Sequence, residues 1–158
     1  MKAVCDTSPI CYLLLIGEIE LLPALYDRLL VPRAVAVELS HPEAPLVLKG
    51  WMADPPGWLE IHPIHPRLSS DLGHLQLGER EAILLAEEVG ADQVVLDDLA
   101  AREAARRRGL GVTGLLGILD QAAEKSLVDL SGAVERLRKT SFHVAPNLLK
   151  NLLDRHAR

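Results

Sequence analysis

The sequence predicts an open α/β fold, in which helices cover both faces of a mostly parallel, five-stranded sheet. Short apolar runs alternate with helical segments five times along the 158 residues. The runs stop at polar or glycine-containing segments, as buried strands of a parallel sheet do. The length corresponds to about one domain, and we see no repeat or linker that divides the chain. Residues 1–158 are therefore expected to form a single domain.

The first half of the chain begins with the apolar run Ala3-Val4-Cys5, which stops at Asp6-Thr7-Ser8-Pro9. Thr7 or Ser8 can cap a helix, and proline suits the first turn of one. The run Asp54-Pro55-Pro56-Gly57 ends a later helix. The elements predicted here are strands over 3–5, 29–31 and 58–61, and helices over 10–16, 19–26, 34–39 and 42–52.

The second half opens with an irregular stretch over 62–76, which we expect to be a long loop. Gly90 and Gly109 each follow a helical pattern, in the position where glycine ends a helix. The elements predicted after the loop are strands over 93–96 and 111–113, and helices over 78–89, 99–108, 114–125, 131–138 and 146–155.

Composition narrows the class of protein. The net charge is −5 and charged residues make up 25%, which excludes a disordered or histone-like chain. Aromatic residues make up only 3%, too few for a platform that stacks single-stranded bases. Cys5 and Cys11 fit no zinc spacing. We expect a cytoplasmic protein without a signal peptide or membrane span.

Acidic residues fall where a ligand would bind. Ligands of open α/β sheets lie at the carboxyl ends of the strands. Asp6 follows the first strand there, and Asp97 and Asp98 follow the fourth. Acidic residues in two helices can reach the same edge, namely Glu38, Glu79 and Glu81.

Clustered carboxylates need a compensating charge, because two of them at 4 Å repel by roughly 4 kcal/mol at an effective dielectric of about 20. Oxygen ligands suit Mg²⁺ or Mn²⁺. A site of this kind, with water left on the metal, is suited to phosphodiester hydrolysis. The sequence therefore indicates a candidate metal-dependent nuclease site.

Each acid also has a simpler interpretation. Asp6 and Asp98 could cap the helices that follow them. Glu79 and Glu81 could complement the dipole of their helix, and Glu38 could be solvated. The placement of Asp6, Asp97 and Asp98 at strand ends weighs against these interpretations when the acids are taken together.

Five short motifs in order make the sequence resemble the PIN-domain family. The resemblance extends from Val4 to about Leu153 and is greatest for a small prokaryotic branch related to VapC-type toxins. The motifs are Cys5-Asp6-Thr7-Ser8-Pro9; Leu29-Leu30-Val31-Pro32 with Glu38; Gly78-Glu79-Arg80-Glu81-Ala82-Ile83; Leu96-Asp97-Asp98 with Ala101-Arg102; and Val112-Thr113-Gly114 with Leu116-Gly117-Ile118.

The resemblance implies a three-layer α/β/α sandwich and an acidic, metal-dependent ribonuclease site. Asp6 matches the family's first acid and Glu38 the second. The third falls on Glu79 or Glu81, where most VapC-type members have Asp, and the fourth falls on Asp97 or Asp98. Thr7 or Ser8 would orient Asp6 or a water, and Thr113 is a further supporting candidate. The catalytic candidates are Asp6, Glu38, Glu81, Asp97 and Asp98, and the metal-ligand candidates are Asp6, Glu79, Glu81, Asp97 and Asp98.

Basic, histidine-containing and apolar segments are further candidates for binding surfaces. Arg102 and Arg106 could contact RNA phosphates, although a solvated basic face is the simpler interpretation. Three histidines in the 62–76 loop match no standard metal site. The apolar surplus of the helix near residues 9–16 suggests a homodimer surface, or only burial against the sheet.

The leading hypothesis is a Mg²⁺- or Mn²⁺-dependent endoribonuclease, expected to be the toxin of a toxin–antitoxin pair with a cognate antitoxin protein. The alternative is a non-catalytic PIN-like module that binds RNA or a protein partner. A phospho-acceptor receiver domain is disfavoured because Val112-Thr113-Gly114 offers no lysine. A dinucleotide-binding domain is disfavoured because no glycine-rich fingerprint follows the first strand.

Overall fold

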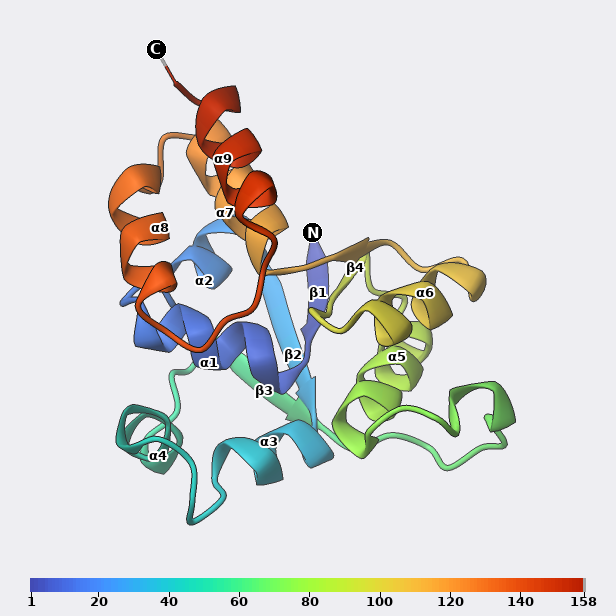
Figure 1. Ribbon diagram of the computed structural model, residues 1–158. Helices are drawn as coiled ribbons and strands as arrows, with labels where there is room; N and C mark the ends of the chain where they lie inside the picture. The colour runs from blue at the N-terminus through green and yellow to red at the C-terminus, as the bar shows by residue number, and fades with distance from the viewer. Residues whose placement is uncertain (158) are drawn as a thin grey trace.

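The computed structural model describes residues 1–157 and contains a five-stranded sheet with helices on both sides (Figure 1). Every strand pair is parallel, and the strand order is β3-β2-β1-β4-β5. The first strand therefore lies at the centre, between the second and the fourth. The strands are β1 (Lys2–Cys5), β2 (Arg28–Pro32), β3 (Leu59–His62), β4 (Gln93–Val95) and β5 (Val112–Thr113).

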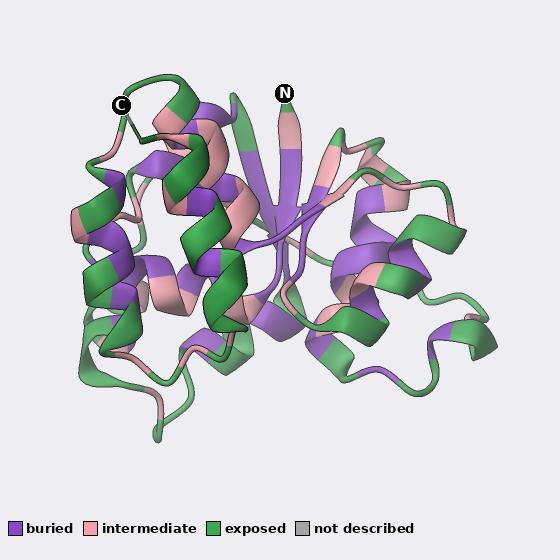
Figure 2. Ribbon diagram, turned by 45° about the horizontal axis from the view of Figure 1, so that its top comes forward, coloured by how far each residue is buried: buried purple, intermediate pink, exposed green. Residues whose placement is uncertain are grey.

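The helices form the outer layers. Figure 2 shows the buried strands running between two groups of helices that are buried on the sides facing the sheet. The helices are α1 (Thr7–Leu15), α2 (Leu21–Leu25), α3 (Arg33–Leu39), α4 (Leu46–Ala53), α5 (Leu77–Val89), α6 (Leu99–Arg107), α7 (Leu115–Glu124), α8 (Leu130–Arg138) and α9 (Pro146–Arg155).

Neighbouring strand residues point into two different cores, as the two-residue period of a strand requires. Cys5 and Val31 pack with α1, α2, α7, α8 and α9 on one face. Val4 and Leu30 pack with α5 and α6 on the other. The predicted three-layer α/β/α sandwich is therefore confirmed. The sheet is entirely rather than mostly parallel.

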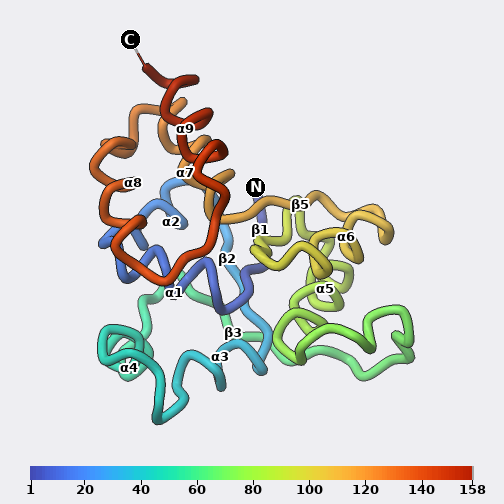
Figure 3. The backbone as a smooth tube through the Cα atoms, viewed as in Figure 1, coloured from blue at the N-terminus to red at the C-terminus, as the bar shows by residue number. Residues whose placement is uncertain are grey.

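Segments distant in sequence meet on the first of these faces. Figure 3 shows α1 on the same side of the sheet as α7, α8 and α9, about a hundred residues further along the chain. The side chains of Tyr12, on α1, and Phe142, in the segment between α8 and α9, lie with ring centroids 5.0 Å apart. The C-terminal helices thereby cover the helix that begins directly after β1.

The predicted element boundaries differ from the structure in a few places. The helix predicted over 42–52 begins only at Leu46, because Pro45 has an extended backbone and occupies the N-cap position. The 62–76 stretch contains a short 3₁₀ turn, Ser70–Leu72. Gly90 and Gly109 have φ of +63° and +77°, the left-handed conformation expected of glycine after a helix.

The apolar surplus of α1 is explained within the chain. Pro9, Ile10, Leu13 and Leu14 are buried, whereas Leu15 is 42% exposed. Burial against the sheet and helices therefore accounts for the surplus, and a homodimer remains an expectation. None of the described helices is long and apolar enough to cross a lipid bilayer.

Candidate active site

Acidic side chains from four segments line one cavity of about 650 Å³ at the carboxyl edge of the sheet. We call it the acid cavity. Because the segments come from both outer layers and from the sheet itself, the fold rather than any single motif assembles this surface. Its acids are Asp6, Glu38, Glu79, Asp97 and Asp98, and its other lining residues are Thr7, Ser8, Cys11, Tyr12, His74, Leu75, Gln76 and Ala100.

The pairing of β1 with β4 brings three of these acids together. Cys5 pairs with Val95, and the Asp6 N–H donates to the Val95 carbonyl at 3.1 Å. Asp6 and the Asp97-Asp98 pair therefore leave two adjacent parallel strands at the same edge. This is the position where ligands of open α/β sheets bind.

The start of α5 lets two carboxylates approach each other. A Cβ atom on Gly78 would lie 2.6 Å from Glu38 Oε1 and 3.2 Å from Asp6 Oδ1. Both oxygens therefore occupy space that any side chain at position 78 would fill. Gly78 is the residue that allows α3 and the end of β1 to present their acids at one point.

The two hydroxyl groups after Asp6 orient other acids. Thr7 Oγ1 donates to Glu38 Oε2. Ser8 Oγ donates to Asp97 Oδ2 at 3.1 Å, and the Leu115 N–H donates to Asp97 Oδ1 at 2.8 Å. The side chains of Thr7 and Ser8 thus hold Glu38 and Asp97, whereas the resemblance had suggested Asp6 or a water as their partner.

Glu79 and Glu81 have different surroundings. Glu79 lines the acid cavity, and its Oε1 accepts a hydrogen bond from the Gln76 N–H at 3.0 Å. Glu81 lies outside the lining, and its Oε1 accepts from the Ala34 N–H at 3.2 Å, in the first turn of α3. The structure therefore separates Glu81 from the other candidate acids, because its carboxylate caps a neighbouring helix.

Asp98 both caps a helix and lines the acid cavity. Its Oδ2 accepts from the Ala101 N–H at 3.0 Å, so it caps α6 as the simpler interpretation predicts. The same residue lines the acid cavity. Asp6 also occupies an N-cap position, before α1, but its side chain makes no capping hydrogen bond.

Burial changes the proton affinity of three acids in this cavity. Burial raises the pKa of Asp6 to about 7, the Thr7 N–H opposes the shift, and the charges of Glu79, Glu38 and Asp97 reinforce it. Burial also raises the pKa of Asp97 and of Glu79 above their usual ranges. The negative charge of the cavity is therefore only partly compensated by the protein.

The donor set fits a hard divalent cation. Within residues 1–157, every ion pair is formed by other acids, so none of the five has an arginine or lysine partner. Carboxylate oxygens are the ligands that Mg²⁺ and Mn²⁺ prefer. In the same part of the chain, however, no three Asp, Glu, His or Cys side chains are already close enough to hold an ion. Side chains would have to move to coordinate one.

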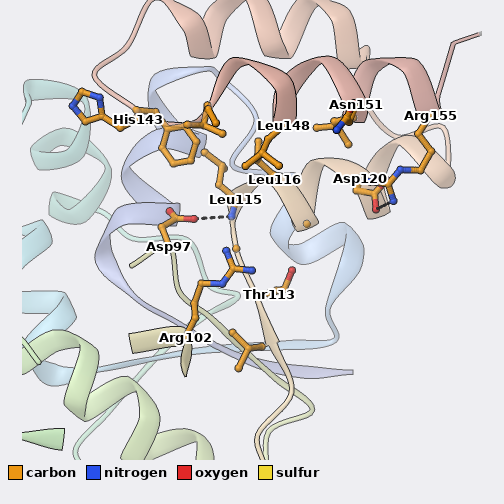
Figure 4. A pocket seen from close by; sticks show the side chains of 17 residues that line it. Asp97, Arg102, Thr113, Leu115, Leu116, Asp120, His143, Leu148, Asn151 and Arg155 are labelled. Carbon is orange, nitrogen blue, oxygen red and sulfur yellow. Dashed lines mark hydrogen bonds and ion pairs between the residues drawn. The ribbon is translucent and has the colours of Figure 1, made fainter. Parts of the chain in front are cut away.

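Thr113 and Arg102 lie outside the acid cavity, in a second cavity of about 650 Å³ at the N-terminus of α7. Figure 4 shows both side chains together with Asp97, which lines both cavities. We call this second space the α7 cavity. Arg106 is exposed on α6 and lines neither cavity.

Sequence reasoning missed several residues of the acid cavity. His74 and Gln76 lie in the stretch that the sequence predicts to be a loop, and Tyr12 lies within a predicted helix. The one signal available was the Gln76-x-x-Glu79 spacing, which places a glutamate where it can bond back to the helix start. Gly78 belongs to the third motif, but its closeness to Glu38 could not be predicted, because that contact depends on tertiary packing.

Comparison with known proteins identifies a family. No curated protein matches the sequence. A family model described as a PIN domain matches residues 2–158, which is nearly the whole chain. PIN domains are generally nucleases that use divalent metals, so the match agrees with an acidic cavity at the strand ends. The chain therefore belongs to the PIN-domain family.

Proposed function

We propose that the protein is a metal-dependent endoribonuclease that hydrolyses RNA phosphodiester bonds in the acid cavity with Mg²⁺ or Mn²⁺. The observation that carries this proposal is the meeting of five acids in one cavity, none of which forms an ion pair with a lysine or arginine within residues 1–157. Such a set of carboxylates favours a divalent cation as its counter-charge. Asp6, Glu38, Glu79, Asp97 and Asp98 are the residues that would hold it.

When bound, a divalent cation makes water more acidic and neutralises charge on the phosphate. The protein contributes oriented oxygen ligands. Thr7 holds Glu38, and Ser8 together with the Leu115 N–H holds Asp97. Restrained carboxylates lose less freedom when a ligand arrives than freely rotating ones. The hydroxyl groups of Thr7 and Ser8 are therefore positioning residues in this proposal.

Cleavage of a labelled RNA by the purified full chain tests the proposal. We expect cleavage with 1 mM Mn²⁺ or Mg²⁺ and none with EDTA. Asp6→Asn should lower the rate by roughly 100-fold, since even outer-shell partners of metal sites cost about 10–100-fold. Asp54→Asn, which changes an exposed acid outside the cavity, serves as the control. Absence of cation-dependent cleavage across mixed RNA substrates would contradict the proposal.

One observation favours a second candidate, a non-catalytic PIN-like module that binds RNA or a protein partner. Within residues 1–157 the acids do not already form a three-ligand metal group. Calorimetric titration with Mn²⁺ separates the two functions. Heat of binding that disappears in Asp6→Asn supports the nuclease, whereas a silent titration supports the non-catalytic module.

We also propose that the protein is the toxin of a toxin–antitoxin pair and that it forms a homodimer. The resemblance of its five motifs to VapC-type toxins supports both the toxin role and the homodimer. The homodimer is tested by light scattering, in which the purified chain should give twice the mass of 17.3 kDa. The toxin role is tested by expression, which should arrest growth, and Asp6→Asn should relieve the arrest. Normal growth during expression of active nuclease would contradict the toxin role.

A further inference from the structure

The α7 cavity has the size of a ligand-binding cavity and apolar walls. Its volume is about 650 Å³, which lies within the range of cavities that hold small molecules. Leu116 lies in the first turn of α7, and Leu148 and Leu152 lie on one face of α9. Figure 4 shows Leu116 and Leu148 in its upper part, and Arg102 and Thr113 below them. The leucines therefore offer apolar surface to a ligand.

An aromatic ring completes this apolar surface. Phe142 lines the α7 cavity, whereas Tyr12 lines the acid cavity, and their ring centroids are 5.0 Å apart in an edge-to-face arrangement. The hydroxyl groups of Tyr12 and Ser141 are hydrogen-bonded at 2.9 Å, and the Phe142 N–H donates to Thr140 Oγ1 at 3.2 Å. These contacts fix the ring between the two cavities, which lowers the entropy cost of stacking a ligand on it.

The charged groups of the α7 cavity offset one another. Its lining contains two acids and two arginines, and Asp120 accepts from Arg155 at 3.1 Å. A Cβ atom on Gly114 would lie 3.0 Å from Asp97 Oδ1 and 3.3 Å from Arg102 Nη1, so this second pair of opposite charges meets at one residue. The α7 cavity therefore favours a neutral ligand, in contrast to the acid cavity.

Two uncharged polar side chains of the cavity are unused. Within residues 1–157, the Asn151 amide and the Thr113 hydroxyl make no hydrogen bond. Asn151 lies on the same face of α9 as Leu148 and Leu152. An amide both donates and accepts. It can therefore bond the edge of a ligand whose faces contact the leucines.

We propose that the α7 cavity is a nucleobase-binding subsite, in which Phe142 and the leucines contact the faces of the base and Asn151 hydrogen-bonds its edge. Proteins that read single-stranded RNA stack bases on aromatic rings and bond their edges in this way. One ring serves one base, so a platform of several rings is not needed.

The position of the subsite indicates which base it takes. Because Asp97 lines both cavities, a base held here lies beside the acid cavity. The base therefore belongs to a nucleotide next to the bond to be cleaved, and the subsite selects the sequence that is cut. This assignment to RNA rests on the proposed nuclease function, whereas binding of a nucleobase does not.

Ribonucleosides test the subsite without phosphate, metal or cleavage. Titrations of the full chain in EDTA, followed by saturation-transfer NMR, should detect binding of at least one of the four common ribonucleosides. Asn151→Ala should weaken this binding by about fivefold, because a hydrogen-bonding partner of the base is lost. Asn147→Ala is the matched control, since Asn147 is exposed on the same helix and lies outside the cavity. It should change binding by less than about twofold.

Cleavage of a random-sequence RNA pool with Mn²⁺ tests the assignment to RNA. Sequencing of the cut ends should show that the wild type prefers one base by about 10-fold at one fixed position beside the cleaved bond. Asn151→Ala should reduce this preference to less than about threefold, and Asn147→Ala should keep it. A merely structural role of Asn151 would change the cleavage rate without changing the base preference.

Phe142→Leu separates stacking from reading of the base edge. Stacking tolerates every base, so this variant should lower cleavage of all sequences by about 10-fold and keep the base preference. Loss of the preference in Phe142→Leu, with the preference intact in Asn151→Ala, would overturn the roles given to the two residues.

The outcomes distinguish the sources of the base. Loss of nucleoside binding and of base preference in Asn151→Ala, but not in Asn147→Ala, supports the subsite. Loss of nucleoside binding with an unchanged base preference assigns the cavity to a free nucleoside or nucleotide and overturns its role for RNA. If the wild type binds no nucleoside, or if Asn151→Ala matches Asn147→Ala in both measurements, the proposal is wrong. Nucleoside binding that depends on Asn151, without any RNA cleavage, supports the nucleobase site and contradicts the nuclease function.

Discussion

Glu79 and Glu81 are two residues apart on α5, and this spacing sends their side chains in different directions around the helix. Glu79 lines the acid cavity, whereas Glu81 caps α3 through the Ala34 N–H. We predict that Glu79→Gln lowers the rate of Mn²⁺-dependent RNA cleavage by at least about 10-fold. Glu81→Gln should change the rate by less than about threefold and lower the free energy of unfolding by about 1 kcal/mol.

Cleavage rates and urea unfolding of the two variants provide the measurement. Each variant is the other's control, because both replace a glutamate of the same helix by its isosteric amide. The opposite result, an inactive Glu81→Gln beside an active Glu79→Gln, would show that catalysis does not occur in the acid cavity.

Asp6 gives a prediction about pH. Its pKa in the folded protein is about 7, above the usual value for Asp, so the folded state binds a proton that the unfolded state releases. The free energy of unfolding of the metal-free protein therefore falls as the pH rises from about 4 to about 7. Asp6→Asn has no carboxyl to ionise, so it avoids this fall in the free energy of unfolding. The variant should be more stable than the metal-free wild type by about 2–4 kcal/mol at pH 8.

Urea unfolding in EDTA measures this effect. The advantage of Asp6→Asn should shrink by about half or more between pH 8 and pH 5, because the wild-type carboxyl becomes protonated. Asp54→Asn changes an exposed acid and should show no such pH dependence. A stability difference that is constant from pH 5 to pH 8 would mean that burial of Asp6 does not raise its pKa.

At the scale of an element, the first turn of α5 depends on the absence of a side chain at position 78. A Cβ there would lie 2.6 Å from Glu38 Oε1, the movable end of a side chain. We predict that Gly78→Ala keeps the fold, since alanine favours helices by about 0.5–1 kcal/mol over glycine. It should nevertheless displace Glu38 and lower cleavage by about 10–100-fold.

Circular dichroism melting and RNA cleavage test this prediction together. Gly50→Ala is the matched control, because Gly50 lies within α4 and a Cβ there meets nothing within 4 Å. It should leave the cleavage rate unchanged. Full activity in Gly78→Ala would show that Glu38 does not need its present position.

Most elements could be predicted from the sequence because each follows from local chemistry. Apolar runs mark the strands, and Gly90 and Gly109 mark helix ends through their left-handed conformation. The start of α4 was less predictable, because Pro42 and Pro45 are both acceptable near a helix start and only Pro45 occupies the cap.

At the scale of the whole molecule, the sequence predicts the site less completely than the fold, because the site depends on how distant elements pack. Asp6, Asp97 and Asp98 were predictable because parallel strands bring their carboxyl ends to one edge. The choice between Glu79 and Glu81 was not, because it depends on how α5 packs beside α3. The α7 cavity was also out of reach, since its lining joins α6, β5, α7 and α9.

The acid cavity joins elements from the whole fold, so a cation bound there should stabilise the molecule against global unfolding. Asp6 follows β1, Glu38 lies on α3, Glu79 on α5, and the Asp97-Asp98 pair follows β4. Free Mn²⁺ at about 100 times its Kd would contribute about 2.7 kcal/mol, or a rise in Tm of about 5–10 °C at this chain length.

Protons compete with the metal for carboxylates, and the pKa of Asp6 is about 7. The rise should therefore be larger at pH 8 than at pH 5.5, and small at both in Asp6→Asn. Melting curves with MnCl₂ and with EDTA at the two pH values provide the measurement. An equal rise at both pH values, or an undiminished rise in Asp6→Asn, would place the cation somewhere other than the acid cavity.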